Sequence, residues 1–186
     1  MKAHYCIFVI TAFFLSCVHC GAPSEPKEYI HTRAGFKITA PAGWKKKSED
    51  FEMFEFRSGD YKLVEVGGFA LGIPPDDFYR LTDDDFFALL RESTREGLDS
   101  YCTEATIRDY TISDSRETVW GDRIAYRAQA KGYSNETMAS MVVDIIAIVY
   151  EEKSRVYMFA SQIDEKAYAQ TKKYLELMIA SFQIIE

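Results

Sequence analysis

The sequence MASMVVDIIAIVY at residues 138–150 contains a single charged side chain and is otherwise dominated by valine, isoleucine and other apolar residues. Such a run predicts a central β-strand that is covered on both faces. The polar turn EEKS follows it and leads into VYMFASQI at residues 156–163. A gap this short predicts an antiparallel hairpin, so the sheet of this 186-residue chain is expected to form around these two segments.

The strand expected before this hairpin, residues 123–131, alternates between apolar and polar side chains. This alternation predicts one buried and one solvated face. Asp144 is the lone charge in the apolar run, and a buried carboxylate is costly unless it is paired. We therefore expect Asp144 to be held by Arg123 or Arg127 on the neighbouring strand, rather than to act in catalysis.

The remaining sequence predicts further strands and two helices. Thr82 and Asp85 have the spacing of a capping box, with Gly97 as a plausible helix end. The acidic residues there cap the helix or, as the alternative, bind calcium together with Asp76 and Asp77. Asp164 caps a final helix with an apolar stripe. Additional strands are predicted at residues 36–40, 51–56, 61–73 and 106–113, the third of these with a bulge or a close backbone approach at Gly67–Gly68.

The order of strands, helix, strands, helix is typical of an α+β fold. We predict a central antiparallel sheet of about six to seven strands sandwiched by helices, formed by one domain over residues 33–186.

Charge and histidine content exclude several classes of function. With 29 acidic and 22 basic residues the net charge is −7, which disfavours avid nucleic-acid binding. The only histidines are His4, His19 and His31, so the body from residue 36 onward lacks the imidazole needed for Ser/His/Asp or clustered-histidine metal sites. We therefore expect no enzymatic activity, no catalytic residues, no cofactor and no metal.

The amino terminus predicts export. Residues 1–16 have a short apolar core of the kind found in signal peptides. The sequence FLSC at residues 14–17 resembles a relaxed bacterial lipobox, so Cys17 is expected to carry the lipid, including palmitate. The alternative is an ordinary secretory signal cleaved near Cys20 or Gly21. Residues 17–32 are predicted to be a flexible, lipidated stalk.

This arrangement predicts attachment to the cell envelope membrane, with the periplasmic face or surface of the outer membrane favoured. Lys45, Lys46 and Lys47 form the one basic cluster. They are expected either to contact anionic headgroups beside the anchor or to form a solvated turn.

Three segments resemble the PsbP-like, or Mog-type, superfamily. Residues 36–44 (FKITAPAGW) resemble its opening F-x-I-x-x-P-x-G-W, residues 120–127 (WGDRIAYR) resemble its turn and strand, and residues 178–182 (MIASF) resemble its closing helix. Bacterial lipoproteins such as DcrB and LpqN are members. The resemblance implies an antiparallel sheet sandwiched by helices that serves as a non-catalytic accessory module.

Two functions follow as hypotheses. The first is a lipid-anchored envelope protein whose domain has a protein-interaction or assembly role, with the membrane and another envelope protein as partners. The alternative is a carrier for a small apolar or aromatic ligand, bound in a cleft between sheet and helix. The aromatic residues proposed to line that cleft are Phe54, Phe56, Phe69, Phe78 and Tyr79.

Overall fold

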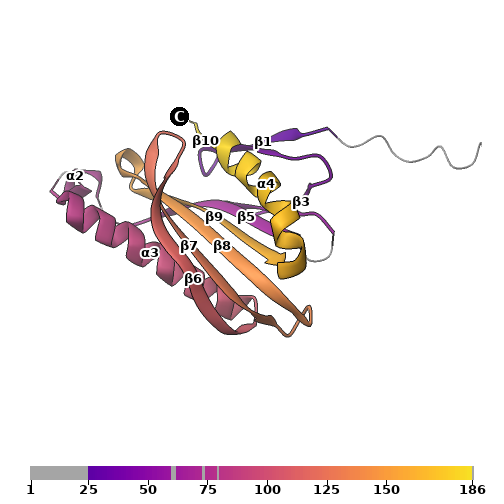
Figure 1. Cartoon of the computed structure of the whole chain (residues 1–186). Helices are drawn as coiled ribbons and strands as arrows, with labels where there is room; N and C mark the ends of the chain where they lie inside the picture. Colours follow the sequence, from indigo (N-terminus) through magenta and orange to yellow (C-terminus); the bar gives the residue numbers. More distant parts are fainter. Residues whose placement is uncertain (1–24, 60–61, 73, 79, 186) are drawn as a thin grey trace, which may run out of the picture.

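The computed structural model describes residues 25–59, 62–72, 74–78 and 80–185 (Figure 1). These residues form two antiparallel sheets with helices packed on them. The elements are β1 (Lys27–His31), β2 (Phe36–Ala40), β3 (Lys45–Glu49), β4 (Met53–Arg57), β5 (Lys62–Ala70), α2 (Pro75–Phe78), α3 (Asp83–Glu104), β6 (Ile107–Trp120), β7 (Arg123–Ser134), β8 (Ala139–Tyr150), η1 (Glu151–Lys153), β9 (Arg155–Asp164), α4 (Glu165–Ser181) and β10 (Gln183–Ile184).

The larger sheet has seven strands in the order β3-β4-β5-β9-β8-β7-β6. The predicted hairpin of β8 and β9 is confirmed, and the two strands pair antiparallel from Met141 opposite Asp164 to Tyr150 opposite Arg155. Residues from Met141 to Val149 are buried throughout, because both faces of β8 are covered. β9 also pairs with β5, which joins the carboxyl-terminal hairpin to the amino-terminal strands.

Helices cover both faces of this sheet, as predicted. α3 packs on β6, β7 and β8, whereas α4 packs on the opposite face against β8 and β9 (Figure 1). The smaller sheet, in the order β1-β2-β10, lies beside α4 and was not predicted. Its side chains Phe36 and Ile38 share one core with Phe54 of β4 and Phe159 of β9, so the small sheet completes the cover on the α4 side.

Both helix starts follow the sequence. Thr82 and Asp85 form the predicted capping box, and Asp164 accepts a hydrogen bond from the Lys166 amide at 2.7 Å. The predicted end of α3 at Gly97 is wrong, because the helix runs on to Glu104. Its extension is driven by burial, since Leu98 and Cys102 are both fully buried against the sheet. Within the described residues, no helix combines the length and apolarity needed to cross a membrane.

Gly67 and Gly68 allow a close approach and not a bulge. β5 pairs without interruption with β9 through both residues, and its pairing with β4 reaches Gly67. A Cβ atom on Gly68 would lie 2.5 Å from Cε1 of Tyr157. The ring of Tyr157 therefore occupies the space that any side chain at Gly68 would need.

The amino-terminal boundary of the domain differs from the prediction. Residues 27–31, expected to belong to the flexible stalk, form β1 and pair with β2. His31 is only 2% exposed, accepts a hydrogen bond from the Ala34 amide at 3.1 Å and stacks on Phe36. The folded body therefore contains one imidazole. It fills a corner of the core, and the sequence pattern missed it because residues 27–31 contain few apolar side chains.

Candidate functional site

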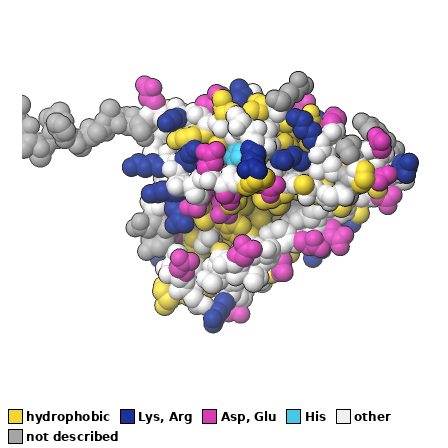
Figure 2. Space-filling model, turned by 180° about the vertical axis from the view of Figure 1, so that it is seen from behind, with side chains coloured by type: hydrophobic (Ala, Val, Ile, Leu, Met, Phe, Trp, Pro, Cys, Tyr) yellow, Lys and Arg dark blue, Asp and Glu magenta, His cyan; other side chains and the backbone are white. Residues whose placement is uncertain are grey.

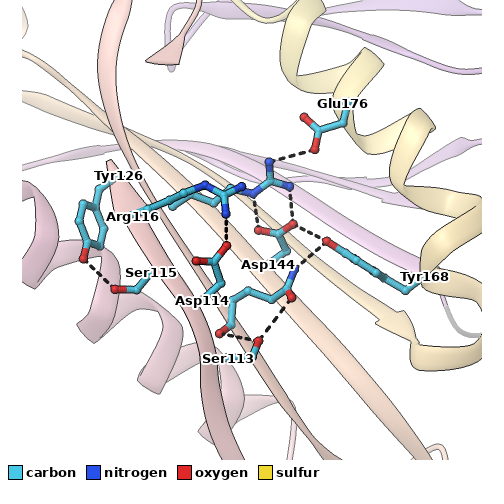
Figure 3. Close-up of polar contacts among 10 residues, drawn as sticks. Ser113, Asp114, Ser115, Arg116, Tyr126, Asp144, Tyr168 and Glu176 are labelled. Atoms are coloured by element: carbon cyan, nitrogen blue, oxygen red, sulfur yellow. Dashed lines mark hydrogen bonds and ion pairs between the residues drawn. The ribbon is translucent and has the colours of Figure 1, made fainter. Parts of the chain in front are cut away.

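A network of polar side chains lies between the large sheet and α4 (Figure 3). Arg127 of β7 donates from Nε to Asp144 of β8 at 2.8 Å and donates again from Nη2. Tyr168 of α4 donates its hydroxyl to the same carboxylate at 2.9 Å, and Glu176 of α4 accepts from Arg127 at 2.9 Å. Gln129 donates to the Tyr168 hydroxyl at 2.7 Å. The predicted pairing of Asp144 is confirmed, with Arg127 as its partner.

This network joins α4 to the sheet. The hydrogen bonds to Asp144 raise the pKa of Arg127, and burial together with the charge of Asp144 raises the pKa of Tyr168. Arg127 therefore stays charged and Tyr168 stays protonated at neutral pH, so neither is suited to exchange protons with a substrate. One nearby hydroxyl, on Ser161 of β9, is buried with no hydrogen-bond partner among the described residues.

Figure 3 also shows polar contacts that reach the edge strand β6. They join Arg116 to Asp114, Ser115 to Tyr126, and Ser113 to Gln129.

A second feature, the α3 cavity, lies between α3 and the part of the sheet formed by β4, β5, β9 and β8. Its volume is about 310 Å³. Figure 2 shows a hollow on the rear face, lined by hydrophobic side chains and edged by acidic ones. The apolar lining of the α3 cavity includes Met53, Phe69, Ile145, Met158 and Ala160.

The polar lining of the α3 cavity comes from β5 and from the last turns of α3. Glu65 lies on β5, and Ser100, Tyr101 and Glu104 lie on α3. Burial raises the pKa of Glu65, although its interaction with Tyr101 opposes that shift. Burial likewise raises the pKa of the Tyr101 hydroxyl well above its usual value, and the charge of Glu65 adds to the effect. The cavity therefore has one acidic side in an otherwise apolar wall.

Neither Glu65 nor Tyr101 was predicted from the sequence as a site residue. The sequence does mark Glu65 as unusual, because it is the one charge in the otherwise apolar stretch LVEVGGFAL, which also contains two glycines. Nothing in the spacing of the sequence connects it to Tyr101.

The aromatic residues predicted to line a cleft have several different environments. Phe54 and Phe56 are fully buried in the core on the α4 side, and Phe78 is 5% exposed in a separate cluster near the start of α3. Only Phe69 lines the α3 cavity. Tyr79 lies outside the described residues. The prediction of a common cleft for these rings is therefore wrong, because alternate residues of β4 and β5 face opposite sides of the sheet.

The predicted basic cluster, residues 45–47, lies in the edge strand β3. These residues therefore do not form the solvated turn that was the alternative prediction. Lys45 and Lys47 are exposed. Lys46 is half-buried, pairs with Glu49 at 2.6 Å and lies over the rings of Tyr29 and Phe54. Strand alternation thus separates Lys46 from the other two lysines, and contact with membrane headgroups stays a prediction.

The predicted lipid site, Cys17, is not among the residues that the structure describes, and neither is Cys20. Cys102 is a free, fully buried thiol, and burial raises its pKa to about 11. A thiol of this kind is unreactive at neutral pH.

The predicted cap at the start of α3 is confirmed. Asp85 accepts from the Thr82 hydroxyl at 2.7 Å, and Asp77 pairs with Arg80 at 3.2 Å. Across the described part of the chain, no group of three histidine, cysteine or acidic side chains converges as a metal site would require.

Comparison of the sequence with protein-family models and with curated proteins gives no match. Solved structures do match. One is the Ran-binding protein Mog1p of Saccharomyces cerevisiae, with a TM-score of 0.59, 9% identity and coverage of 88% of this chain and 97% of that one. Another is cyanobacterial PsbP (CyanoP) of Synechocystis, with a TM-score of 0.56, 14% identity and coverage of 90% and 96%.

A third similar structure is LpqN of Mycobacterium tuberculosis, described as involved in cell envelope biogenesis. Its TM-score is 0.50, its identity is 10%, and the match covers 91% of this chain and 89% of LpqN. These likenesses agree with the antiparallel sheet covered by helices on both faces. The chain therefore has the PsbP/Mog-like fold.

Proposed function

We propose that this protein is a lipid-anchored envelope protein whose domain is a non-catalytic module for protein interaction or assembly. Two observations support the envelope role: the lipobox-like sequence at residues 14–17 and the fold shared with LpqN, a protein of cell envelope biogenesis. The binding role is supported by the same fold in the Ran-binding protein Mog1p. The polar network around Asp144 supports a non-catalytic domain because its groups are engaged with one another.

The observation that carries the binding role is an exposed apolar surface at the β6–β7 turn. Val119 and Ile124 are cross-strand neighbours on β6 and β7, and they are 63% and 49% exposed. Ile124 also lines a groove of about 480 Å³ with Phe86 and Phe87 at the start of α3. Adjacent apolar side chains left in solvent are typical of a surface that another protein covers.

Site-specific photo-crosslinking tests this surface in intact cells. A photoreactive amino acid at Val119 should give a discrete adduct with one envelope protein. The matched control is Leu177 on α4, which is 60% exposed but lies outside the proposed surface. Adducts of equal yield at both positions, or none at Val119, would contradict the proposed interface.

The lipid anchor has its own test. Cells fed radiolabelled palmitate should label the parent protein and the Cys20→Ala variant, but not Cys17→Ala. Labelling that survives Cys17→Ala would show that Cys17 is not the anchor. Recovery of label in the outer-membrane fraction is expected for the favoured location.

The α3 cavity favours a second candidate function, a carrier for a small apolar or aromatic ligand. Its volume of about 310 Å³ lies at the lower end of the range for small-molecule sites. The cavity lies between sheet and helix, although, of the predicted lining rings that the structure describes, it contains only Phe69.

A further inference from the structure

Among the residues that the structure describes, the carboxylate of Glu65 has no cationic partner. It is half-buried on β5, and no ion pair reaches it from any residue that the structure describes. The charge of Arg57 lowers the pKa of Glu65, but Arg57 is engaged with Glu55 at 2.6 Å. Glu55 is the direct cross-strand neighbour of Glu65, and Glu104 approaches from α3, so the other charges that act on Glu65 are negative.

The hydroxyl of Tyr101 lies in the same part of the α3 cavity. Its oxygen is fully buried and makes no hydrogen bond of ordinary geometry with a described residue, although it interacts with Glu65. A buried hydroxyl without a hydrogen bond is unfavourable unless something supplies the missing partner. Two interacting polar groups, a carboxyl and a hydroxyl, thus line the same part of the cavity, and neither is engaged by a cation or by a hydrogen bond of ordinary geometry among the described residues.

The rest of the α3 cavity offers an apolar compartment kept open by glycine. Gly67 and Gly97 lie on its sheet and helix walls. A Cβ atom on Gly97 would lie 3.2 Å from Sδ of Met158, so a larger side chain there would extend into the cavity. The methionine and aromatic side chains around it suit a flat or short apolar group.

We propose that the α3 cavity binds a small organic ammonium ion with an aromatic or short alkyl body. The ammonium group donates to the Glu65 carboxylate and to the Tyr101 hydroxyl oxygen, and the apolar body lies against Phe69 and Met158. Paired acidic neighbours favour a cation over a neutral or anionic ligand at this end of the cavity. This inference rests on the carrier function and specifies its ligand class.

Calorimetric titration with three probes of one shape tests the ligand class on the full-length protein. The probes are 2-phenylethylamine, which is protonated at neutral pH, the neutral 2-phenylethanol and the anionic 3-phenylpropionate. We expect the amine to bind at least about tenfold more tightly than the alcohol, because a hydrogen bond to a charged group is stronger than one between neutral groups. The carboxylate probe should not bind.

Two matched variants assign the preference to Glu65. Glu65→Gln should lower affinity for the amine to that for the alcohol, whereas Glu96→Gln, an exposed position on the same helix as Tyr101, should change neither. Gly97→Leu should abolish binding of both probes by filling the cavity. Thermal melts of each variant check that a loss of binding is not a loss of folding.

The outcomes separate the ligand class from the carrier function. Equal affinity for amine and alcohol, or an amine preference that survives Glu65→Gln in the folded variant, overturns the ammonium site but leaves the carrier function standing. Binding of none of the three probes to the folded parent protein overturns both.

Discussion

Each face of the large sheet has a carboxylate beneath a helix, but the two carboxylates differ in their hydrogen-bond and ion-pair partners. On the α4 face, Asp144 receives hydrogen bonds from Arg127 and Tyr168. On the α3 face, Glu65 forms no ion pair with any described residue and lies among other acidic groups. The difference follows from how completely each face is covered. α4 and the small sheet together close one face. α3 packs on β6, β7 and β8 and leaves the α3 cavity beside β4 and β5. The paired carboxylate of Asp144 holds α4 against the sheet. The carboxylate of Glu65, which has no such partner among the described residues, is available to a ligand in the cavity.

Breaking the satisfied pair should have the largest effect on stability. Arg127→Met leaves Asp144, which is 3% exposed, charged and without its main partner. Losing one member of a buried pair costs about 3–5 kcal/mol of unfolding free energy. Chemical denaturation of the purified variant measures this loss. The double variant Arg127→Met/Asp144→Leu should recover most of it, and a single variant that loses less than about 1 kcal/mol would contradict the structural role of the pair.

Substitutions that test the packing of the two faces should change the stability by less than the loss of Arg127 does. Gly68→Ala forces a Cβ against the Tyr157 ring on the closed face and should destabilise by about 1–3 kcal/mol. Gly97→Ala meets only the mobile end of Met158 at the α3 cavity, and alanine favours a helix over glycine by about 1 kcal/mol. Denaturation midpoints should therefore fall for the first variant and stay level or rise for the second. The reverse order would show that the α3 face is the more tightly packed one.

The unsatisfied carboxylate should show itself in the pH dependence of stability. The pKa of Glu65 is raised from its ordinary value of 4.5, so the folded protein holds this proton more tightly than the unfolded chain does. Its contribution therefore destabilises the fold progressively as pH rises from 4.5 through the raised pKa. Glu65→Gln should be more stable than the parent at about pH 8 and equal to it near pH 4.

The groups facing Glu65, namely Tyr101, Glu55, Glu104 and Arg57, are unchanged in that variant and keep the comparison matched. Glu96→Gln on the exposed side of α3 should follow the parent curve. A parent and a Glu65→Gln variant with parallel curves would mean that Glu65 is well solvated.

The sequence predicted those elements that local chemistry specifies. Asp164 and Thr82 are caps in the structure because their side chains bond to amides a few residues away. The apolar run at β8 indicated a central strand because no other environment would bury so many adjacent side chains. Asp144 was predicted to be paired because isolated burial of its charge is too costly.

Features that depend on distant partners could not be predicted in the same way. β3 and β1 are polar edge strands. Their own residues show no strong strand pattern, and they form strands because they pair with β4 and β2. α3 passes through Gly97 because the helix is held by burial on the sheet, which outweighs the low helix propensity of glycine. The α3 cavity requires Glu65 and Tyr101 to meet across 36 positions of sequence, and no periodicity indicates that contact.

The strand pairing of β10 has a consequence for the order in which the molecule can be completed. β2 receives β1 from the preceding residues of the chain, but its other neighbour, β10, comes from residues 183–184. The Ile185 amide then bonds to the Gly35 carbonyl at 2.9 Å. A chain emerging from the ribosome cannot close this side of its core until residue 185 has emerged, so nascent chains that end before Gln183 should remain sensitive to protease.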